Sequence, residues 1–171
     1  MARKKRVPFT LKSPNFRHNG TIGMEHVFNS FGCTGQNLSP ALAWSGAPEG
    51  TKSFALLCHD PDAPTGGAGW WHWLVLNIPA SATGLARDAG RADGSGLPAG
   101  VAHVNTDFGG PGWGGPCPPV GDKPHRYVFT LYALKVDKLD ASGGTASLAG
   151  YMVNGNAVGK AKLIGRFGRK K

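Results

Sequence analysis

Short runs of apolar and β-branched residues, separated by glycine- and proline-rich segments, dominate this chain and predict β-strands. Residues 53–59 are mostly apolar, which is typical of a strand buried on both faces. Residues 70–78 are aromatic and β-branched and are followed by Pro79, which favours a strand that ends there. Residues 126–135, rich in Tyr, Val, Phe, Thr and Leu, carry the clearest strand pattern. Shorter strands are predicted at residues 9–11, 42–44, 100–105 and 162–167.

Helix is predicted in only one place, residues 145–153. The expected buried face of this helix consists of Leu148, Ala149, Met152 and Val153. The Asn154-Gly155-Asn156 segment is a poor helix interior and should end it. Residues 81–100 are mostly Gly, Ala and Ser, so we expect a mobile surface excursion there. Many strands with little helix predict an antiparallel β-sandwich with one or two short helices.

The length of 171 residues fits a single domain, and the basic charge is concentrated at the two ends. We expect a flexible basic tail over residues 1–12, one domain over residues 13–167 and a basic tail over residues 168–171. The terminal basic residues are Arg3, Lys4, Lys5, Arg6, Arg166, Arg169, Lys170 and Lys171. The formal net charge is +9, but without those eight the remaining 11 basic residues face 10 acidic ones. The ends are therefore either solvated tails or weak, salt-sensitive contacts for nucleic acids or acidic membranes.

The cellular compartment and the redox state of the cysteines are predicted from targeting signals and from the number and position of the cysteines. Residues 7–12 contain no apolar core of a signal peptide, and no run reaches membrane-spanning length, so a cytoplasmic location is expected. Three cysteines is an odd number, and Cys58 sits in an apolar run as a core residue would. Cys33 and Cys117 lie in glycine-rich loops and are expected to be free thiols rather than a disulfide.

Candidate chemistry is concentrated around two carboxylates one residue apart, Asp60 and Asp62, with Pro61 between them. Such a pair costs free energy unless it binds a cation, shares a proton or accepts hydrogen bonds, although Asp beside Pro also simply caps turns. The following Trp70-Trp71-His72-Trp73 segment adds aromatic walls and a titratable donor. Together these features indicate the mouth of a binding site for a small polar ligand.

Strand alternation predicts which of these side chains meet. One expected face of the strand over residues 70–78 carries Trp70, His72, Leu74 and Leu76. Trp71 and Trp73 would then lie on the opposite face as core residues. One expected face of the later strand carries His125, Tyr127, Phe129 and Leu131. If the two faces meet, the histidines and Tyr127 gather with Trp70 around the aspartates, an arrangement that one β-bulge would break.

Four motifs in this order carry a resemblance to a known family. They are Ser39-Pro40-x-Leu42-x-Trp44, the Asp60 to Pro64 segment, the strand from Trp70 to Pro79, and Gly115-Pro116-Cys117-Pro118-Pro119 with His125-Arg126-Tyr127 behind it. Together they closely resemble the phosphatidylethanolamine-binding protein family, also called the Raf kinase inhibitor proteins. The Cys-Pro-Pro form looks like its bacterial and archaeal branch. The resemblance covers residues 13–166.

The resemblance implies a β-sandwich with a small pocket for phosphate-like anions or phospholipid head groups. The pocket residues it implies are Asp60, Asp62, Pro64, Trp70, His72, Gly115, Cys117, Pro118, His125 and Tyr127. Two positions depart from the animal members, because Cys117 stands in place of glycine and Trp71 in place of a second histidine. A protonated His72 or His125 and the Tyr127 hydroxyl would donate to phosphate. The aspartates and Trp70 would face an ammonium group.

The leading hypothesis is therefore a non-enzymatic binding protein without a cofactor. The resemblance adds regulation of a protein kinase or protease, and a homodimer, as expectations. A second hypothesis is a metal-dependent or acid–base hydrolase, built on Asp60, Asp62, His59, His72 and His125. A third is nucleic-acid binding through the basic tails. The Asp107-Phe108-Gly109 sequence matches a kinase signature, but the chain lacks a kinase's length and catalytic loop, so we interpret it as chance.

Overall fold

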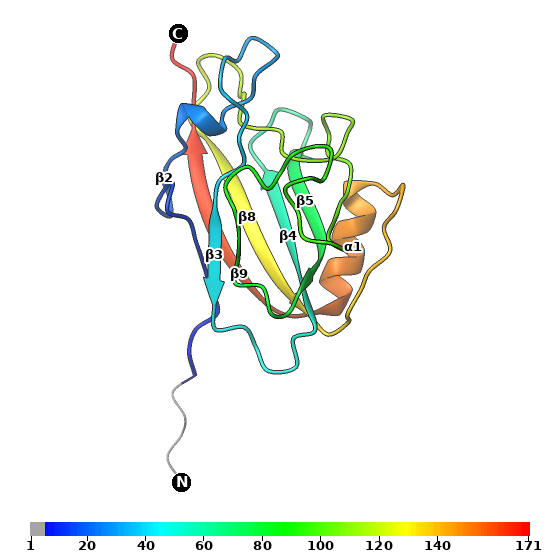
Figure 1. Cartoon of the computed structure of the whole chain (residues 1–171). Coiled ribbons are helices and arrows are strands. Elements are labelled where there is room, and N and C mark those ends of the chain that lie inside the picture. The colour runs from blue at the N-terminus through cyan, green and yellow to red at the C-terminus, as the bar shows by residue number, and fades with distance from the viewer. Residues whose placement is uncertain (1–5) are drawn as a thin grey trace.

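The computed structural model describes residues 6–171, which form two packed β-sheets with one α-helix on the outside (Figure 1). The strands are β1 Thr10–Lys12, β2 Gly20–Thr21, β3 Leu42–Ser45, β4 Ser53–Asp60, β5 Trp70–Pro79, β6 Gly84–Leu85, β7 Ala102–His103, β8 His125–Leu134 and β9 Ala157–Phe167. The helices are the short 3-10 helix η1 Met24–His26 and the α-helix α1 Ala146–Asn156. The predicted mainly β sandwich is confirmed.

The large sheet has the strand order β2-β9-β8-β4-β5-β7, and the small sheet the order β1-β3-β6. All pairings are antiparallel except that of β2 with β9. β4 lies between β5 and β8 and is buried at seven of its eight positions, which confirms the prediction from its apolar run. A strand flanked on both sides and covered on both faces has no solvent side for polar residues.

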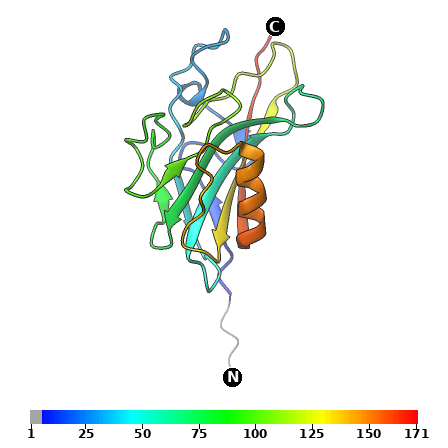
Figure 2. The same ribbon diagram turned by 90° about the vertical axis from the view of Figure 1, so that its right-hand side faces the viewer.

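Two apolar layers cover the two faces of the large sheet. Phe54, Phe129 and Leu131 belong to the core between the sheets, which Trp44 of the small sheet completes. Leu57 and other side chains on the opposite face pack against α1, which lies along that face (Figure 2). The sandwich therefore buries β4 between the small sheet and the helix, and burial of this apolar area is the main stabilising contribution.

The helix differs from its prediction at its end and on its buried face. The hydroxyl of Thr145 caps it by accepting a hydrogen bond from the Leu148 N–H (3.1 Å). The helix continues through Asn156, because the amide side chains of Asn154 and Asn156 donate to carbonyls one turn back. Leu148 points outward and is 46% exposed. The buried positions are Ala146, Ala149 and Val153. Within residues 6–171, no helix combines the length and apolarity needed to cross a membrane.

Residues 91–100 are mostly exposed, as their composition predicts, but residues 81–90 are not a surface excursion. β6 lies within this segment and pairs with β3. Leu85 and Ala89 are buried in the core between the sheets. A side chain at Gly90 would collide with Trp113 and Ser39, so the small residues here allow close packing rather than looseness.

Both predicted tails are shorter than expected. Thr10–Lys12 forms β1, and its Leu11 is buried, so the folded region begins before residue 13. The basic residues Arg3, Lys4 and Lys5 lie outside the described residues. At the other end, Arg169 bridges to Val120, and its guanidinium Nε donates to the carbonyl of Pro118 (2.6 Å).

A β-bulge in β5 corrects the predicted alternation. Trp71 and Trp73 pair with consecutive residues of β4, which leaves His72 between them as the extra residue. Trp73 therefore turns into the core between the sheets, whereas Leu74 and Leu76 pack on the helix side. The prediction that both leucines share a face with His72 is wrong, as is the placement of Trp73 opposite it.

Candidate functional site

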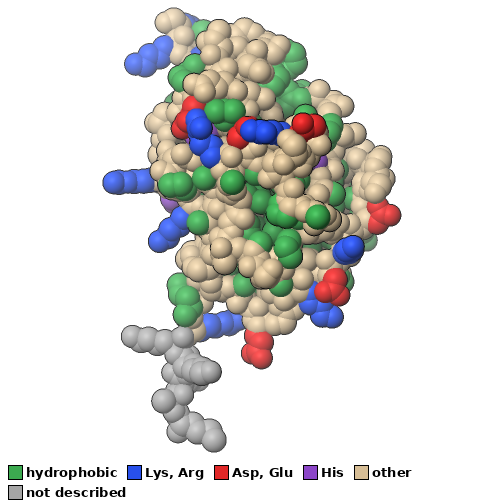
Figure 3. Space-filling view, viewed as in Figure 1, with side chains coloured by type: hydrophobic (Ala, Val, Ile, Leu, Met, Phe, Trp, Pro, Cys, Tyr) green, Lys and Arg blue, Asp and Glu red, His purple; other side chains and the backbone are tan. Residues whose placement is uncertain are grey.

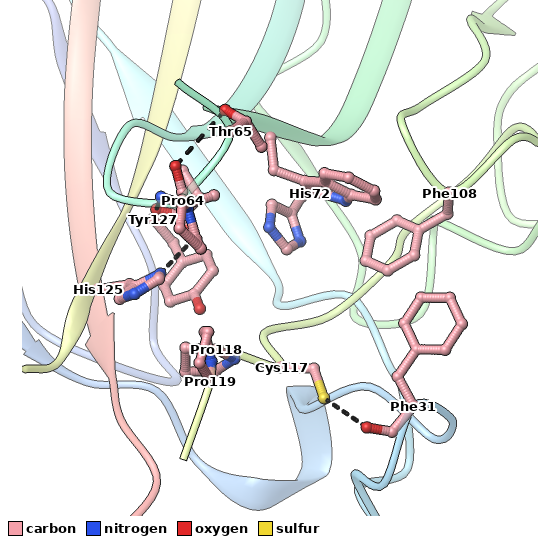
Figure 4. Close-up of a pocket in the computed structure, with 13 residues that line it drawn as sticks. Phe31, Pro64, Thr65, His72, Phe108, Cys117, Pro118, Pro119, His125 and Tyr127 are labelled. Atoms are coloured by element: carbon pink, nitrogen blue, oxygen red, sulfur yellow. Dashed lines mark hydrogen bonds and ion pairs between the residues drawn. The ribbon is translucent and has the colours of Figure 1, made fainter. Parts of the chain in front are cut away.

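A cavity of about 300 Å³ opens at the end of the sandwich where β4 stops and β5 and β8 begin. Eight of the ten predicted site residues line it: Asp60, Pro64, Trp70, His72, Cys117, Pro118, His125 and Tyr127. The remaining lining residues are Phe31, Ala63, Thr65, Phe108 and Pro119. Figure 4 shows Phe31 and Phe108 on one side of the cavity and His125 and Tyr127 on the other.

The cavity forms although the predicted alternation of β5 is wrong beyond His72. The bulge lies at His72, so Trp70 and His72, which precede the change of face, both line the cavity as predicted. In β8 the pairing with β4 is uninterrupted from His59 onward, and His125 and Tyr127 share the cavity side. The side chains of three neighbouring strands are thereby gathered at one sheet end.

Asp60 and His125 form a buried pair at the base of the cavity, each 3% exposed. The Nδ1–H of His125 donates to Asp60 Oδ2 (2.7 Å), and its Nε2–H donates to Asp122 Oδ2 (3.1 Å). Burial by itself would lower the pKa of His125, but these hydrogen bonds outweigh burial and raise it. Because a carboxylate only accepts hydrogen bonds, both ring nitrogens carry protons and the ring is an imidazolium.

Asp60 is satisfied on its other oxygen as well. Its Oδ1 accepts the backbone N–H groups of Asp62 (2.8 Å) and Ala63 (3.1 Å). The turn-capping role that Asp often plays beside Pro is thus real here, and it coexists with the histidine pair. These bonds hold the Asp60 carboxylate in place at the cavity wall.

Asp62 does not line the cavity. Its carboxylate accepts from Arg126 at the backbone N (2.8 Å), Nε (3.0 Å) and a terminal nitrogen (2.8 Å). The hydrogen bond from the Arg126 side chain is the main reason that the pKa of Asp62 falls to about 2. The two aspartates of the motif therefore avoid repulsion by taking different cations, His125 for one and Arg126 for the other.

Gly115 also lies outside the cavity lining. Its N–H donates to the side-chain oxygen of Asn37 (2.8 Å). A Cβ at this position would collide with the carbonyl oxygen of His26, so the motif needs glycine where two backbone segments touch. Gly115 shapes the wall behind the cavity and makes no contact with its space.

His72 presents a single free nitrogen to the cavity. Its Nδ1 lies 2.5 Å from the carbonyl oxygen of Gly114, so Nδ1 carries the proton and donates it. Burial lowers the pKa of His72 to about 4, and the ring is neutral at physiological pH. Its Nε2 is then a hydrogen-bond acceptor. The donor expected of a protonated His72 is therefore not available at neutral pH.

Two buried donors at the cavity have no partner. The hydroxyl of Tyr127 and the indole N–H of Trp70 make no hydrogen bond within residues 6–171. Tyr127 is fully buried, and burial together with the nearby Asp60 carboxylate raises the pKa of its hydroxyl. The hydroxyl therefore keeps its proton. Unsatisfied buried donors cost free energy, which a ligand with acceptor oxygens would recover.

An aromatic rim encloses the outer side of the cavity. The ring of Phe108 lies 4.5 Å from that of Phe28, 6.1 Å from Phe31 and 5.4 Å from Trp70, measured between centroids. Phe31 is 68% exposed at the cavity mouth. Sequence reasoning missed Phe31 and Phe108. The sequence signal that could have identified them is an aromatic residue in each of two glycine-rich loops. At Phe108 this signal was overlooked, because the residue was considered only as part of the kinase-like Asp107-Phe108-Gly109 motif.

A disulfide joins Cys33 to Cys117 across the cavity rim, with the Cα atoms 6.0 Å apart. The prediction of two free thiols is wrong, whereas Cys58 is free and buried as expected. The bridge ties the loop that carries Phe31 to the Pro118 wall. The sequence could not show that these two loops meet, because the two cysteines lie 84 positions apart along the chain.

The hydrolase hypothesis depended on a metal-binding cluster or an acid–base pair. Among residues 6–171, no three His, Cys, Asp or Glu side chains are arranged to hold a metal ion. Asp62 is bonded to Arg126, and His59 Nε2 lies 2.9 Å from the carbonyl oxygen of Ala68. The proposed ligands are therefore distributed over separate hydrogen-bond networks.

Comparison with known proteins assigns the chain and its fold to a family. The phosphatidylethanolamine-binding protein profile matches residues 12–168. The chain belongs to this family. The Escherichia coli protein YbcL is 51% identical over 91% of this chain and 85% of its own length. The Escherichia coli protein YbhB is 42% identical over 92% of this chain and 98% of its own length.

Family membership extends to the three-dimensional structure. The crystal structure of Escherichia coli YbcL, described as a member of the mammalian family, superposes with a TM-score of 0.92 at 48% identity. That superposition covers 95% of this chain and 99% of YbcL. A Mycobacterium tuberculosis member, LppC, is named as a candidate lipoprotein and is 38% identical over 94% of this chain and 72% of its own length. The cytoplasmic location stays a prediction.

Proposed function

We propose that this protein binds a small phosphate-like anion, free or within a phospholipid head group, and that it does so without catalysis. The observation that carries the proposal is a pair of buried, unpartnered donors, Tyr127 O–H and Trp70 Nε1–H, on two residues that line a cavity of about 300 Å³. Both donors lack a protein acceptor, so the oxygens of a bound anion would satisfy them and form the stronger, charge-assisted hydrogen bonds.

The charge around the cavity supports a weak rather than a tight site. The His125 imidazolium lies at the base of the cavity, and two carboxylates, Asp60 and Asp122, already neutralise it. Recognition therefore depends on neutral donors and shape, with little long-range attraction. We expect dissociation constants on the order of micromolar to millimolar, about 4–8 kcal/mol of binding free energy.

A hydrolase remains the weaker reading of the same geometry. The cavity holds one neutral imidazole, His72, and one imidazolium fully engaged by carboxylates. Neither is hydrogen-bonded to a serine, threonine or cysteine nucleophile within residues 6–171. Binding without turnover is what these contacts support.

Protein and nucleic-acid partners stay proposals that the resemblance or the basic ends suggest. On the face drawn in Figure 3, Lys and Arg side chains are scattered and intermixed with Asp and Glu. No continuous basic patch appears on that face, so we give nucleic-acid binding a secondary place. Regulation of a kinase or protease, and homodimer formation, would use surfaces beyond the cavity.

The proposal is tested by titrating inorganic phosphate while NMR spectra of the histidine rings and indole N–H groups are recorded. We expect shifts at His72 and Trp70 that saturate in the micromolar to millimolar range. Tyr127→Phe removes one donor and keeps the ring, and should weaken binding roughly tenfold. Tyr132→Phe, on the helix side of the sheet, is the matched control and should bind normally. An unchanged spectrum at about 50 mM phosphate would refute the proposal.

A further inference from the structure

The polar side chains that line the cavity do not all donate hydrogen bonds. Trp70 and Tyr127, which line the cavity, each carry a buried donor without a partner, the indole N–H and the hydroxyl. His72 Nε2 is an acceptor, because the proton of the neutral ring sits on Nδ1 and is used by the Gly114 carbonyl. A ligand made only of acceptor oxygens would satisfy the two donors and leave a lone pair of His72 facing another lone pair. A ligand that fits has to donate one hydrogen bond as well as accept two.

Protonating His72 instead would be costly in this setting. The ring is 3% exposed, and its aromatic neighbours are Phe108 at 5.4 Å, Tyr127 at 5.1 Å and Trp113 at 6.4 Å between centroids. Burial among such neighbours penalises the imidazolium.

The ionisable groups around His72 come from every element that packs against it. β4 contributes Asp60, which favours the charged ring, and His59, which opposes it. The loop after β7 contributes Asp107, which favours it. Asp60 is already paired with the His125 imidazolium on β8. The carboxylates therefore offset burial only in part, and His72 stays an acceptor at neutral pH.

We propose that the cavity selects anions that still carry an acidic proton, with His72 Nε2 accepting that proton's hydrogen bond. This inference rests on the proposed function and narrows it to inorganic phosphate and singly charged phosphate monoesters. Their P–OH group donates to His72, while the other oxygens accept from Trp70 and Tyr127. Sulfate and phosphodiesters have similar oxygens but no such proton. They bind only after His72 itself takes up a proton from solvent.

Four probes distinguish these ligand classes: inorganic phosphate, sulfate, dimethyl phosphate and glycerophosphoethanolamine. Dissociation constants are measured by NMR titration of the wild-type protein at several pH values between 7.5 and 5.5. At pH 7.5 phosphate should bind at least about tenfold more tightly than sulfate or dimethyl phosphate, the difference expected for one hydrogen bond to a charged ligand. Glycerophosphoethanolamine tests whether an ammonium group can replace the acidic proton.

The pH dependence carries a second, independent signature. Binding of sulfate requires one proton to be taken up by His72, so its affinity should rise roughly tenfold for each pH unit of acidification. Phosphate supplies its own proton, and its affinity should change much less. The ratio of the two affinities therefore falls toward one as the pH decreases.

A variant assigns the effect to His72. In His72→Asn the side-chain amide can keep the bond to the Gly114 carbonyl but lacks the outer nitrogen. Phosphate affinity should fall to that of sulfate, and the pH dependence of sulfate binding should disappear. His18→Asn changes an exposed histidine that does not line the cavity and should behave as wild type.

The outcomes separate the two proposals. If phosphate and sulfate bind equally at pH 7.5, or if glycerophosphoethanolamine matches phosphate, the cavity does not require an acidic proton and this inference is wrong, while anion binding stands. If none of the probes binds at about 50 mM, both proposals fail. Because the wild-type comparison needs no variant, the inference stays refutable even if His72→Asn does not fold.

Discussion

Loss of the Cys33–Cys117 disulfide should destabilise this protein more than any surface substitution. The bridge joins two cysteines 84 positions apart, and the loop that it closes includes all of β3 through β7. In the chain-entropy description, a loop of this length restricts the unfolded chain by about 4.5 kcal/mol. Native disulfides in small domains typically contribute about 2–5 kcal/mol, so we expect a loss of about 3–5 kcal/mol.

The double variant Cys33→Ser with Cys117→Ser is compared with the wild type by urea unfolding, with and without a reductant. Reductant should lower the wild-type midpoint close to that of the variant and leave the variant unchanged. Thiol counting in denaturant without reductant provides a direct check. Only Cys58 should react if the bridge is present.

Two results would refute this reasoning. Three reactive thiols per chain would mean that the bridge is absent from the protein in solution. A stability difference below about 1 kcal/mol would mean that the 84-residue loop is already compact in the unfolded state, so that closing it costs little entropy.

The remaining predictions concern groups at or behind the cavity. Folding lowers the pKa of His72 from 6.5 to about 4. Between these pH values the unfolded chain binds a proton at His72 and the folded chain does not, so acidification from pH 6.5 to 4 should lower the free energy of unfolding by about 3 kcal/mol. Urea unfolding at several pH values should show this loss in the wild type and not in His72→Asn; equal losses would contradict it. Asp60→Asn leaves the buried His125 without its main counter-charge. We expect a lower pKa of His125 in an NMR titration and a loss of about 3–5 kcal/mol in the free energy of unfolding measured with urea. An unchanged His125 titration would show that Asp122 alone supports the charged ring. Gly115→Ala places a methyl group against the His26 carbonyl and should cost about 1–3 kcal/mol in thermal unfolding; full stability would mean that this backbone contact relaxes freely.

Residue patterns along the chain were enough to predict the long strands and much of the cavity. β4, β5 and β8 can be recognised in the sequence as apolar or β-branched runs, because a strand buried in a sheet contains few polar residues. In β8 the pairing with β9 is uninterrupted from His125 to Ala133, so strand alternation alone placed His125 and Tyr127 on one face. These features depend on local geometry, which the chain encodes residue by residue.

Other features arise only from contacts between distant segments. The bulge at His72 reverses the faces of residues 73–76, and a second register shift before Ile78 restores them. No local sequence pattern indicates an extra residue in a strand pairing. Arg126 takes Asp62 away from the cavity because β8 places its guanidinium beside the turn after β4. The chain alone thus determined the strands and the type of chemistry at their ends. Tertiary packing decided which donors stay unpartnered and which cysteines meet, because both depend on groups that come together only when the sheets close.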